Sequence, residues 1–192
     1  MTYADVIRPS TRQYARLYDA ALILCGSLFI ALSAWVAIPL PFSPVPVTGQ
    51  TLSVLLVGAL LGSRRGSLCL LAYLAEGAFG LRVFAGGMAG LAHLVGPRGG
   101  YLVGFVAAAY VTGLLAEREW DRQTGTTLLA MLLGNVAIYA FGLPWLAIFV
   151  GIEKALPLGF YPFIAGDLAK LALAALLLPS GWRVLGLKGK MG

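Results

Sequence analysis

Six stretches of the chain consist mainly of hydrophobic residues, and segments rich in charged residues, glycine or proline separate them. A helix needs about 20 mostly apolar residues to cross the hydrocarbon core of a bilayer. The second and third stretches are shorter than this, so we expect one or both to be tilted or to cross only part of the membrane. The pattern predicts six transmembrane helices near residues 18–38, 50–62, 66–80, 99–117, 127–150 and 161–179.

Composition supports a membrane location. Hydrophobic residues make up 59% of the 192 residues, charged residues only 11%, and the mean hydropathy is +0.86. A soluble domain is nearer a quarter charged. These values predict an all-α membrane protein in which residues 1–192 form a single integral membrane domain.

The first apolar stretch follows Arg8, Arg12 and Arg16, as the apolar core of a secretory signal peptide would. That core is usually about 7–15 residues long, and this stretch is longer. We therefore interpret it as the first transmembrane helix.

The basic residues predict the orientation in a bacterial or archaeal cytoplasmic membrane. Lys and Arg favour the cytoplasmic side of membrane proteins, and an even number of crossings places both termini on one side. With both termini cytoplasmic, three basic residues fall outside: Arg82, Arg98 and Lys154. Ten fall inside: Arg8, Arg12, Arg16, Arg64, Arg65, Arg118, Arg122, Arg183, Lys188 and Lys190. The net charge of +6 is spread between apolar stretches rather than blocked, which argues against a nucleic-acid partner.

Asp167 and Lys170 stand three positions apart at the head of the last apolar stretch. Residues at this spacing share a helix face, and ionisable residues inside a membrane segment indicate a functional site. A carboxylate accepts hydrogen bonds and an ammonium donates them. The pair therefore suits a neutral group with N–H donors beside a carbonyl, such as a urea or an amide. The alternatives are an ion pair that fixes helix packing, or a lysine that extends toward the interface.

Two predicted external loops add further candidates. The segment 39–51 contains four prolines, which favour extended backbone. It ends at Thr48 and Gln50, whose side chains could either cap the next helix or contact a ligand. The segment 80–101 is rich in glycine yet apolar, so we expect it to fold back over a cavity. Its candidate site residues are Phe84, Gly86, Gly87, Arg98 and Tyr101.

Two acid–base residues near these loops have less defined roles. We interpret His93 as structural because it has no partner of metal-ligand type nearby in the sequence. Glu76 is either a site residue or a residue at the membrane interface, and the sequence does not distinguish the two.

Several chemistries lack their sequence signatures. The sequence contains no phosphate-binding loop of the G-x-x-x-x-G-K-[ST] type and no serine nucleophile elbow. Cys25 and Cys69 lie in different apolar stretches and form no C-x-x-C pair, so we interpret both as inert. One histidine in the whole chain argues against a histidine-based zinc site. We therefore expect no metal and no cofactor.

Small residues recur on one face of the first predicted helix: Ala20, Ser27, Ala31 and Ala34. Small side chains let another helix approach closely. This face could therefore dock a partner protein or pack inside the chain itself, and the sequence supports both interpretations equally.

Four blocks of the sequence together resemble the biotin-specific S-component family of energy-coupling factor transporters, the BioY family. They are "PFSPVPVTGQTLSVLLVGALLGSRRG", "LRVFAGGMAGLAHLVGPRGGYLVGF", "GLPWLA" and "PFIAGDLAKLALAAL", and they span the chain from the first to the last predicted helix. The resemblance implies a six-helix protein that captures biotin from outside the cell. In that family the D-x-x-K of the last helix contacts the ureido ring of biotin, and it falls here on Asp167 and Lys170.

The resemblance also implies further site residues and partners. The family's V-T-G-Q and V-F-x-x-G-G blocks line the same cavity. Some relatives carry a polar side chain near Gly86, whereas this sequence reads "FAGGMAG" there. Tyr139, ahead of the "GLPW" block, is a further candidate. The implied partners are a transmembrane coupling protein that docks on the first helix and two ATP-binding-cassette ATPase subunits that drive import, with membrane lipid around the chain. A chain that transported alone would need its own route through the bilayer, most simply by forming a homo-oligomer.

Two alternative functions stay open at the level of sequence. The first is an S-component for a different vitamin, which would keep the fold and change the pocket. The second is a membrane enzyme that uses Asp167 and Lys170 as catalytic groups, or a structural membrane protein in which the pair only packs.

Overall fold

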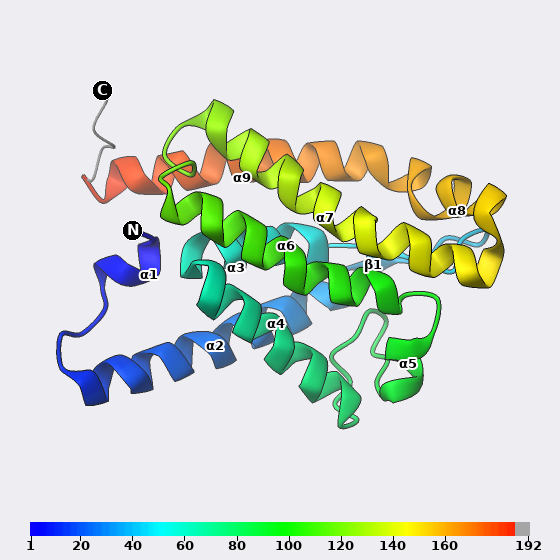
Figure 1. The fold of residues 1–192 in the computed structure, drawn as a ribbon, viewed down its shortest axis with the longest axis horizontal. Coiled ribbons are helices and arrows are strands. Elements are labelled where there is room, and N and C mark those ends of the chain that lie inside the picture. The colour runs from blue at the N-terminus through cyan, green and yellow to red at the C-terminus, as the bar shows by residue number, and fades with distance from the viewer. Residues whose placement is uncertain (187–192) are drawn as a thin grey trace.

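The computed structural model describes residues 1–186 and is predominantly helical. Each predicted apolar stretch lies in one long helix, and these helices run side by side along the long axis of the molecule (Figure 1). The six helices are α2 (Arg12–Trp35), α3 (Gln50–Leu61), α4 (Ser63–Ala78), α6 (Gly99–Glu117), α7 (Thr124–Val150) and α9 (Ile164–Val184).

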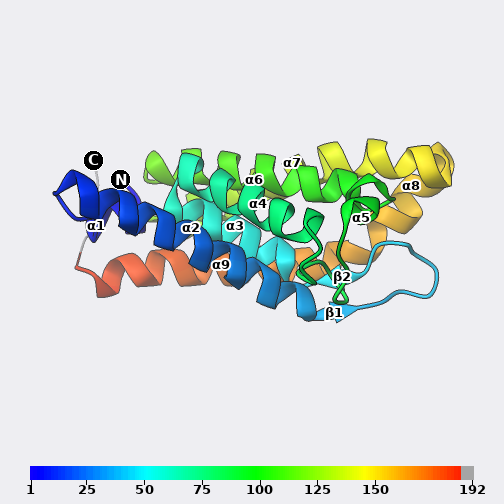
Figure 2. The ribbon, with the colours of Figure 1, turned by 90° about the horizontal axis from the view of Figure 1, so that it is seen from below.

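Shorter elements gather at the two ends of this bundle. α1 (Tyr3–Val6) lies at one end, beside the last turns of α9, and we call this the α1 end (Figure 1). α5 (Leu91–Val95) and α8 (Ile152–Gly159) lie at the other, which we call the α5 end (Figure 2). The strands β1 (Ala37–Ile38) and β2 (Val47–Thr48) pair there in antiparallel fashion, and the loop between them extends toward α8. Both loops predicted to be external therefore lie at the α5 end.

Four helical stretches are long and apolar enough to cross a membrane: Arg12–Trp35, Gly99–Glu117, Thr124–Val150 and Ile152–Val184. The last combines α8, the 3₁₀ turn η1 (Tyr161–Phe163) and α9. α3 has 12 residues and α4 has 16, which gives lengths of roughly 18 and 24 Å at about 1.5 Å per residue. Six crossings and two cytoplasmic termini therefore stay predictions, and two of the basic residues behind them, Lys188 and Lys190, lie outside the described residues.

The helices approach one another through glycine and alanine. α6 packs against α7, α3 and α4 and is the most deeply buried of the four candidate spans. Gly58 of α3 faces α6 so closely that an added Cβ would lie 2.8 Å from the Cα of Ala109 and 2.2 Å from the hydroxyl oxygen of Thr112. Lipid tails are as apolar as leucine, so helix contacts in a membrane depend on this close fit of small residues.

The small-residue face of α2 points mainly into the chain itself. Ser27, Ala31 and Ala34 are buried, and α2 packs there against α4 and α3. The hydroxyl group of Ser27 donates a hydrogen bond of 2.8 Å to the carboxylate of Glu76. Glu76 therefore helps to hold α4 against α2. Of the two interpretations that the sequence left open, the structure favours internal packing for Ser27, Ala31 and Ala34, because the bundle already covers them. Ala20 remains exposed.

Charged side chains hold the α1 end together. Arg65 at the start of α4 donates to Asp5 of α1 at 2.7 Å and to Asp19 of α2 at 2.8 Å.

In the loop before α7, the buried carboxylate of Asp121 accepts a hydrogen bond of 2.6 Å from the indole N–H of Trp182. Its other oxygen has no hydrogen-bond partner within residues 1–186. Burial raises the pKa of Asp121 to about 6, although the Trp182 hydrogen bond and the nearby Arg122 charge oppose this shift.

We expect Gly58→Ala to destabilise the helix bundle by about 1–3 kcal/mol, because the added methyl group has to displace the backbone of α6. The melting temperature of the detergent-solubilised protein measures this loss. Gly125→Ala, in the first turn of α7 with open space around it, is the matched control and should melt at or slightly above the parent temperature. Equal melting of the two variants would contradict the close α3–α6 contact.

Asp121 should make the folded protein less stable as the pH rises. Its pKa of about 6 in the folded chain exceeds the value of about 3.9 expected when unfolded. The stability that proton uptake contributes is therefore complete below about pH 4 and is lost by about pH 6, at a cost of about 2–3 kcal/mol. Asp121→Asn, whose amide oxygen can still accept from Trp182, should remove this loss. The measurement is the difference in melting temperature between parent and variant from pH 4.5 to 7.5, and a constant difference would contradict the assignment.

Candidate ligand-binding site

A pocket opens at the α5 end of the bundle and holds about 590 Å³ of space, part of it open to solvent. The β1–β2 loop, α3, the α5–α6 segment, α7, η1 and α9 all contribute to its wall. The lining residues are Val45, Pro46, Thr48, Gln50, Thr51, Ala85, His93, Arg98, Tyr101, Leu102, Phe105, Ile138, Tyr139, Phe163, Asp167 and Lys170.

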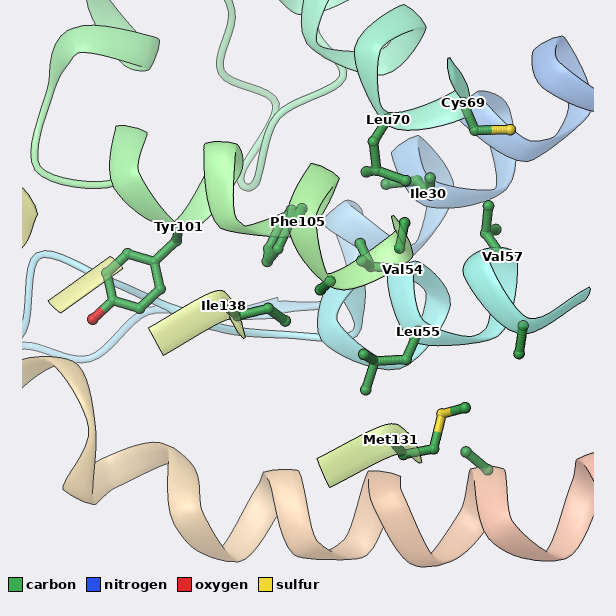
Figure 3. Packing of buried hydrophobic residues seen from close by; sticks show 14 of the residues in the cluster. Ile30, Val54, Leu55, Val57, Cys69, Leu70, Tyr101, Phe105, Met131 and Ile138 are labelled. Carbon is green, nitrogen blue, oxygen red and sulfur yellow. The ribbon is translucent and has the colours of Figure 1, made fainter. Parts of the chain in front are cut away.

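One wall of the pocket is apolar. Phe105 of α6 and Ile138 of α7 lie beside Tyr101 (Figure 3), and Phe163 adds an aromatic ring from η1. Tyr101 is locked in place because its hydroxyl group donates a hydrogen bond of 2.8 Å to the carbonyl oxygen of Gly159. Its ring lies where a side chain at Gly142 would be, since a Cβ there would come within 2.5 Å of the ring. This wall is therefore preorganised for a flat or compact apolar group.

Asp167 and Lys170 of α9 also line the pocket. The ammonium group of Lys170 lies 3.3 Å from Oδ1 of Asp167 and donates a hydrogen bond of 2.7 Å to the hydroxyl oxygen of Thr51 on α3. Asp167 is 5% exposed. Its Oδ2 accepts a hydrogen bond from the Tyr139 hydroxyl and one of 3.2 Å from the Asn135 amide, both on α7. Three helices thus meet at one carboxylate.

The arrangement places an acceptor and a donor side by side in an apolar surrounding. A carboxylate can accept about four hydrogen bonds, and an ammonium group can donate three. A neutral ligand with N–H groups beside a carbonyl can therefore bind both residues without an excess of buried charge. Within residues 1–186, no three His, Cys, Asp or Glu side chains group closely enough to hold a metal ion.

Arg98 and His93 line the pocket near the β1–β2 loop. The guanidinium group of Arg98 donates a hydrogen bond of 2.7 Å to the carbonyl oxygen of Pro44 and so ties the α6 start to that loop. Burial, together with the charge of Arg98, lowers the pKa of His93 below its ordinary value, which keeps the imidazole neutral near pH 7. Arg98 is therefore the positive group of this part of the pocket.

Gln50 and Thr48 both line the pocket, but each already has a structural hydrogen bond. The amide of Gln50 donates a bond of 2.6 Å to the hydroxyl oxygen of Tyr73. The hydroxyl group of Thr48 accepts a bond of 3.3 Å from the backbone N–H of Gln50, at the start of α3. Thr48 therefore supports the helix start and also lines the pocket.

Three residues predicted to contact the ligand shape the neighbouring loop instead. Phe84 is fully buried, packs against Gly77 and stacks on His93 with 5.2 Å between ring centroids. Gly86 and Gly87 form the tight turn beyond it with φ of 74° and 72°, a conformation that favours glycine. None of the three lines the pocket, whereas their neighbour Ala85 does.

Sequence reasoning missed several contributors to the site. Thr51 was not among the predicted site residues, and His93, interpreted as structural, lines the pocket as well as stacking on Phe84. Asn135 does not line the pocket but bonds to Asp167. Its signal was present in the sequence, because it is a strongly polar residue inside an otherwise apolar helix and stands one turn before Tyr139.

Fold and pocket define a helical membrane protein with a small-molecule site at one end. The sequence model of the BioY family matches residues 8–187. Among curated proteins, the biotin transporter BioY of Rhizobium etli is 42% identical over 163 residues, which cover 80% of this chain and 87% of that protein. The corresponding protein of Thermotoga maritima is 43% identical over 153 residues, covering 77% of this chain and 86% of its own. The chain therefore belongs to the BioY family.

A solved structure shows the same fold. The crystal structure of the S-component for biotin from an ECF-type ABC transporter superimposes with a TM-score of 0.79 at 26% identity. The match covers 91% of this chain and 95% of that one. The resemblance inferred from four sequence blocks is thereby confirmed.

Proposed function

We propose that this chain is the substrate-capture subunit of a biotin uptake transporter and binds biotin in the pocket at the α5 end. One observation carries the assignment of the site: the buried Asp167 and the partly buried Lys170, held from three helices, face a largely apolar pocket. The names of the relatives and of the structural neighbour point to the same ligand. The function is binding and transport rather than catalysis.

Biotin combines the two kinds of chemistry that this pocket offers. Its ureido group has two N–H donors beside a carbonyl, so Asp167 accepts from an N–H and Lys170 donates to the carbonyl oxygen. The fused ring lies against the apolar wall of Phe105, Ile138 and Phe163. Burying these polar groups is favourable only because each finds a hydrogen-bond partner.

The carboxylate tail of biotin points toward Arg98. Arg98 is the cationic group in the part of the pocket away from Lys170, and a guanidinium group suits a carboxylate. Gln50 is the less suitable partner because its amide already donates to Tyr73. Since Arg98 also bonds to Pro44, a bound tail would tie the β1–β2 loop to the start of α6.

Membrane topology and partners follow from the same assignment. All six long helices cross the bilayer as one integral domain, both termini are cytoplasmic, and the pocket opens outward. A transmembrane coupling protein with two ATPase subunits drives import. Its contact on α2 is the exposed side around Ala20, together with outward-facing leucines such as Leu24 and Leu28, because Ser27, Ala31 and Ala34 are already covered.

Loss of either member of the charged pair should abolish biotin binding. Asp167→Asn or Lys170→Ala leaves a buried charge unpaired, which costs about 3–5 kcal/mol and weakens binding at least about a hundredfold. Binding of radiolabelled biotin to the detergent-solubilised chain measures this. Lys154→Ala, which removes an exposed lysine of α8, is the matched control and should bind as the parent does.

The outcomes separate the competing functions. Parent binding that survives both substitutions would place the ligand elsewhere in the chain. A folded parent that binds no biotin would lead to competition tests with other vitamins, and then to a search for turnover of a membrane-soluble substrate.

Arg98→Gln tests the orientation of the ligand. The variant should bind biotin about tenfold or more weakly, since the carboxylate loses a charged hydrogen bond. Biotin methyl ester, which has no negative charge, should bind parent and variant with similar affinity. An equal loss for acid and ester would show that Arg98 acts through the loop at Pro44 and not on the tail.

A further inference from the structure

Asn135 is the only asparagine of the sequence and lies inside an apolar helix. It is 7% exposed and stands on α7 one turn before Tyr139, on the side of the helix that faces α9. It does not line the pocket. A buried amide at this depth requires partners, and its one described partner is the carboxylate of Asp167.

The hydrogen bonds around Asp167 are divided unequally between its two oxygens. Oδ2 accepts from the Asn135 amide at 3.2 Å and from the Tyr139 hydroxyl. Oδ1 faces only long contacts, with Lys170 at 3.3 Å and Thr51 at 3.5 Å. The donors of α7 therefore occupy Oδ2, whereas Oδ1, which faces α3 and Lys170, can still accept a shorter hydrogen bond.

The orientation of the Asn135 amide follows from its partner. A carboxylate only accepts hydrogen bonds, so the NH₂ group has to face Asp167. The carbonyl oxygen of Asn135 then has no hydrogen-bond partner in the described part of the chain. Leaving a buried acceptor unpaired is unfavourable. The amide therefore keeps its hydrogen bond to Asp167 at the cost of an unpaired carbonyl oxygen.

We propose that Asn135 is a positioning residue for substrate binding: with Tyr139 it engages Oδ2 of Asp167, and so leaves Oδ1 to receive an N–H of the ligand. Two neutral donors on one rigid helix fix the rotation of the carboxylate. This inference rests on the proposed function, in which Asp167 accepts from the ureido group of biotin.

An isosteric substitution separates positioning from packing. Asn135→Asp keeps the volume but can donate to Asp167 only while the new carboxyl holds a proton. At higher pH the two carboxylates repel each other. The other ionisable groups around Asp167 are Tyr139 on the same helix and Lys170 on α9, and His93, Arg98 and Tyr101 also line the pocket. Because parent and variant share all of them, the ratio of their affinities isolates position 135.

The experiment measures radiolabelled biotin binding from pH 5.5 to 9 for the parent, Asn135→Asp and Asn135→Leu. We expect Asn135→Leu to bind at least tenfold more weakly at every pH. Asn135→Asp should bind within about threefold of the parent at pH 5.5 and at least tenfold more weakly at pH 9. Thr127→Val is the matched control: it removes another buried polar group of α7, whose hydroxyl bonds to Trp120 and Gln123 away from the pocket, and should bind as the parent does.

Two results would overturn the inference. Parental affinity in Asn135→Leu would show that Asp167 needs no support from Asn135. A ratio of Asn135→Asp to parent affinity that stays constant with pH would assign Asn135 to packing alone, and this arm remains decisive if the leucine variant fails to fold. Absence of biotin binding in the parent would instead contradict the proposed function, so the two failures are distinguishable.

Discussion

A carboxylate buried in an apolar helix bundle has to be surrounded by hydrogen-bond donors, and the packing at the α5 end depends on meeting this requirement. Asp167 belongs to α9, but its partners come from α3, α7 and its own helix. The three helices can reach it only if they lie close together. Glycines make this possible: Gly58 lets α3 approach α6, and Gly104 brings α6 within van der Waals contact of the α7 backbone at Ile138.

The two ends of the bundle use charge in different ways. At the α1 end, Arg65 joins two carboxylates and each group has its partner within the chain. This network is partly exposed and ties α1, α2 and α4 together. At the α5 end, the charged pair lies in the wall of a pocket, where a ligand can reach both members. Similar residue types therefore stabilise one end and leave the other available for binding.

Hydrophobic patterning predicted the position of each long helix with ends displaced by up to about six residues, because an apolar stretch of sufficient length leaves little choice in a membrane. It also found Asp167 and Lys170, since two charges in such a stretch are conspicuous. It could not orient the helices about their axes. In a membrane both the core and the lipid-facing side are apolar, so the small residues of α2 looked equally suited to an inward or an outward position.

The remaining site residues depend on contacts between segments far apart in the sequence. Thr51 and Asn135 are 84 residues apart in the sequence. Only the packing of α3, α7 and α9 shows that both donate hydrogen bonds to Asp167. Phe84, Gly86 and Gly87 were predicted to contact the ligand, but in the structure these three residues do not line the pocket. Their block builds the loop beside the pocket, and the residue of this block that lines the pocket is Ala85, between Phe84 and Gly86.

The short turn η1 between α8 and α9 has an electrostatic consequence. Because the 3₁₀ turn interrupts the helical stretch Ile152–Val184, α9 begins anew at Ile164, and Asp167 falls in its first turn. The unpaired N–H groups at the start of a helix create a positive potential there. A break in the backbone thus places the positive end of a helix dipole beside the carboxylate of Asp167, and an uninterrupted helix of the same sequence would lack it.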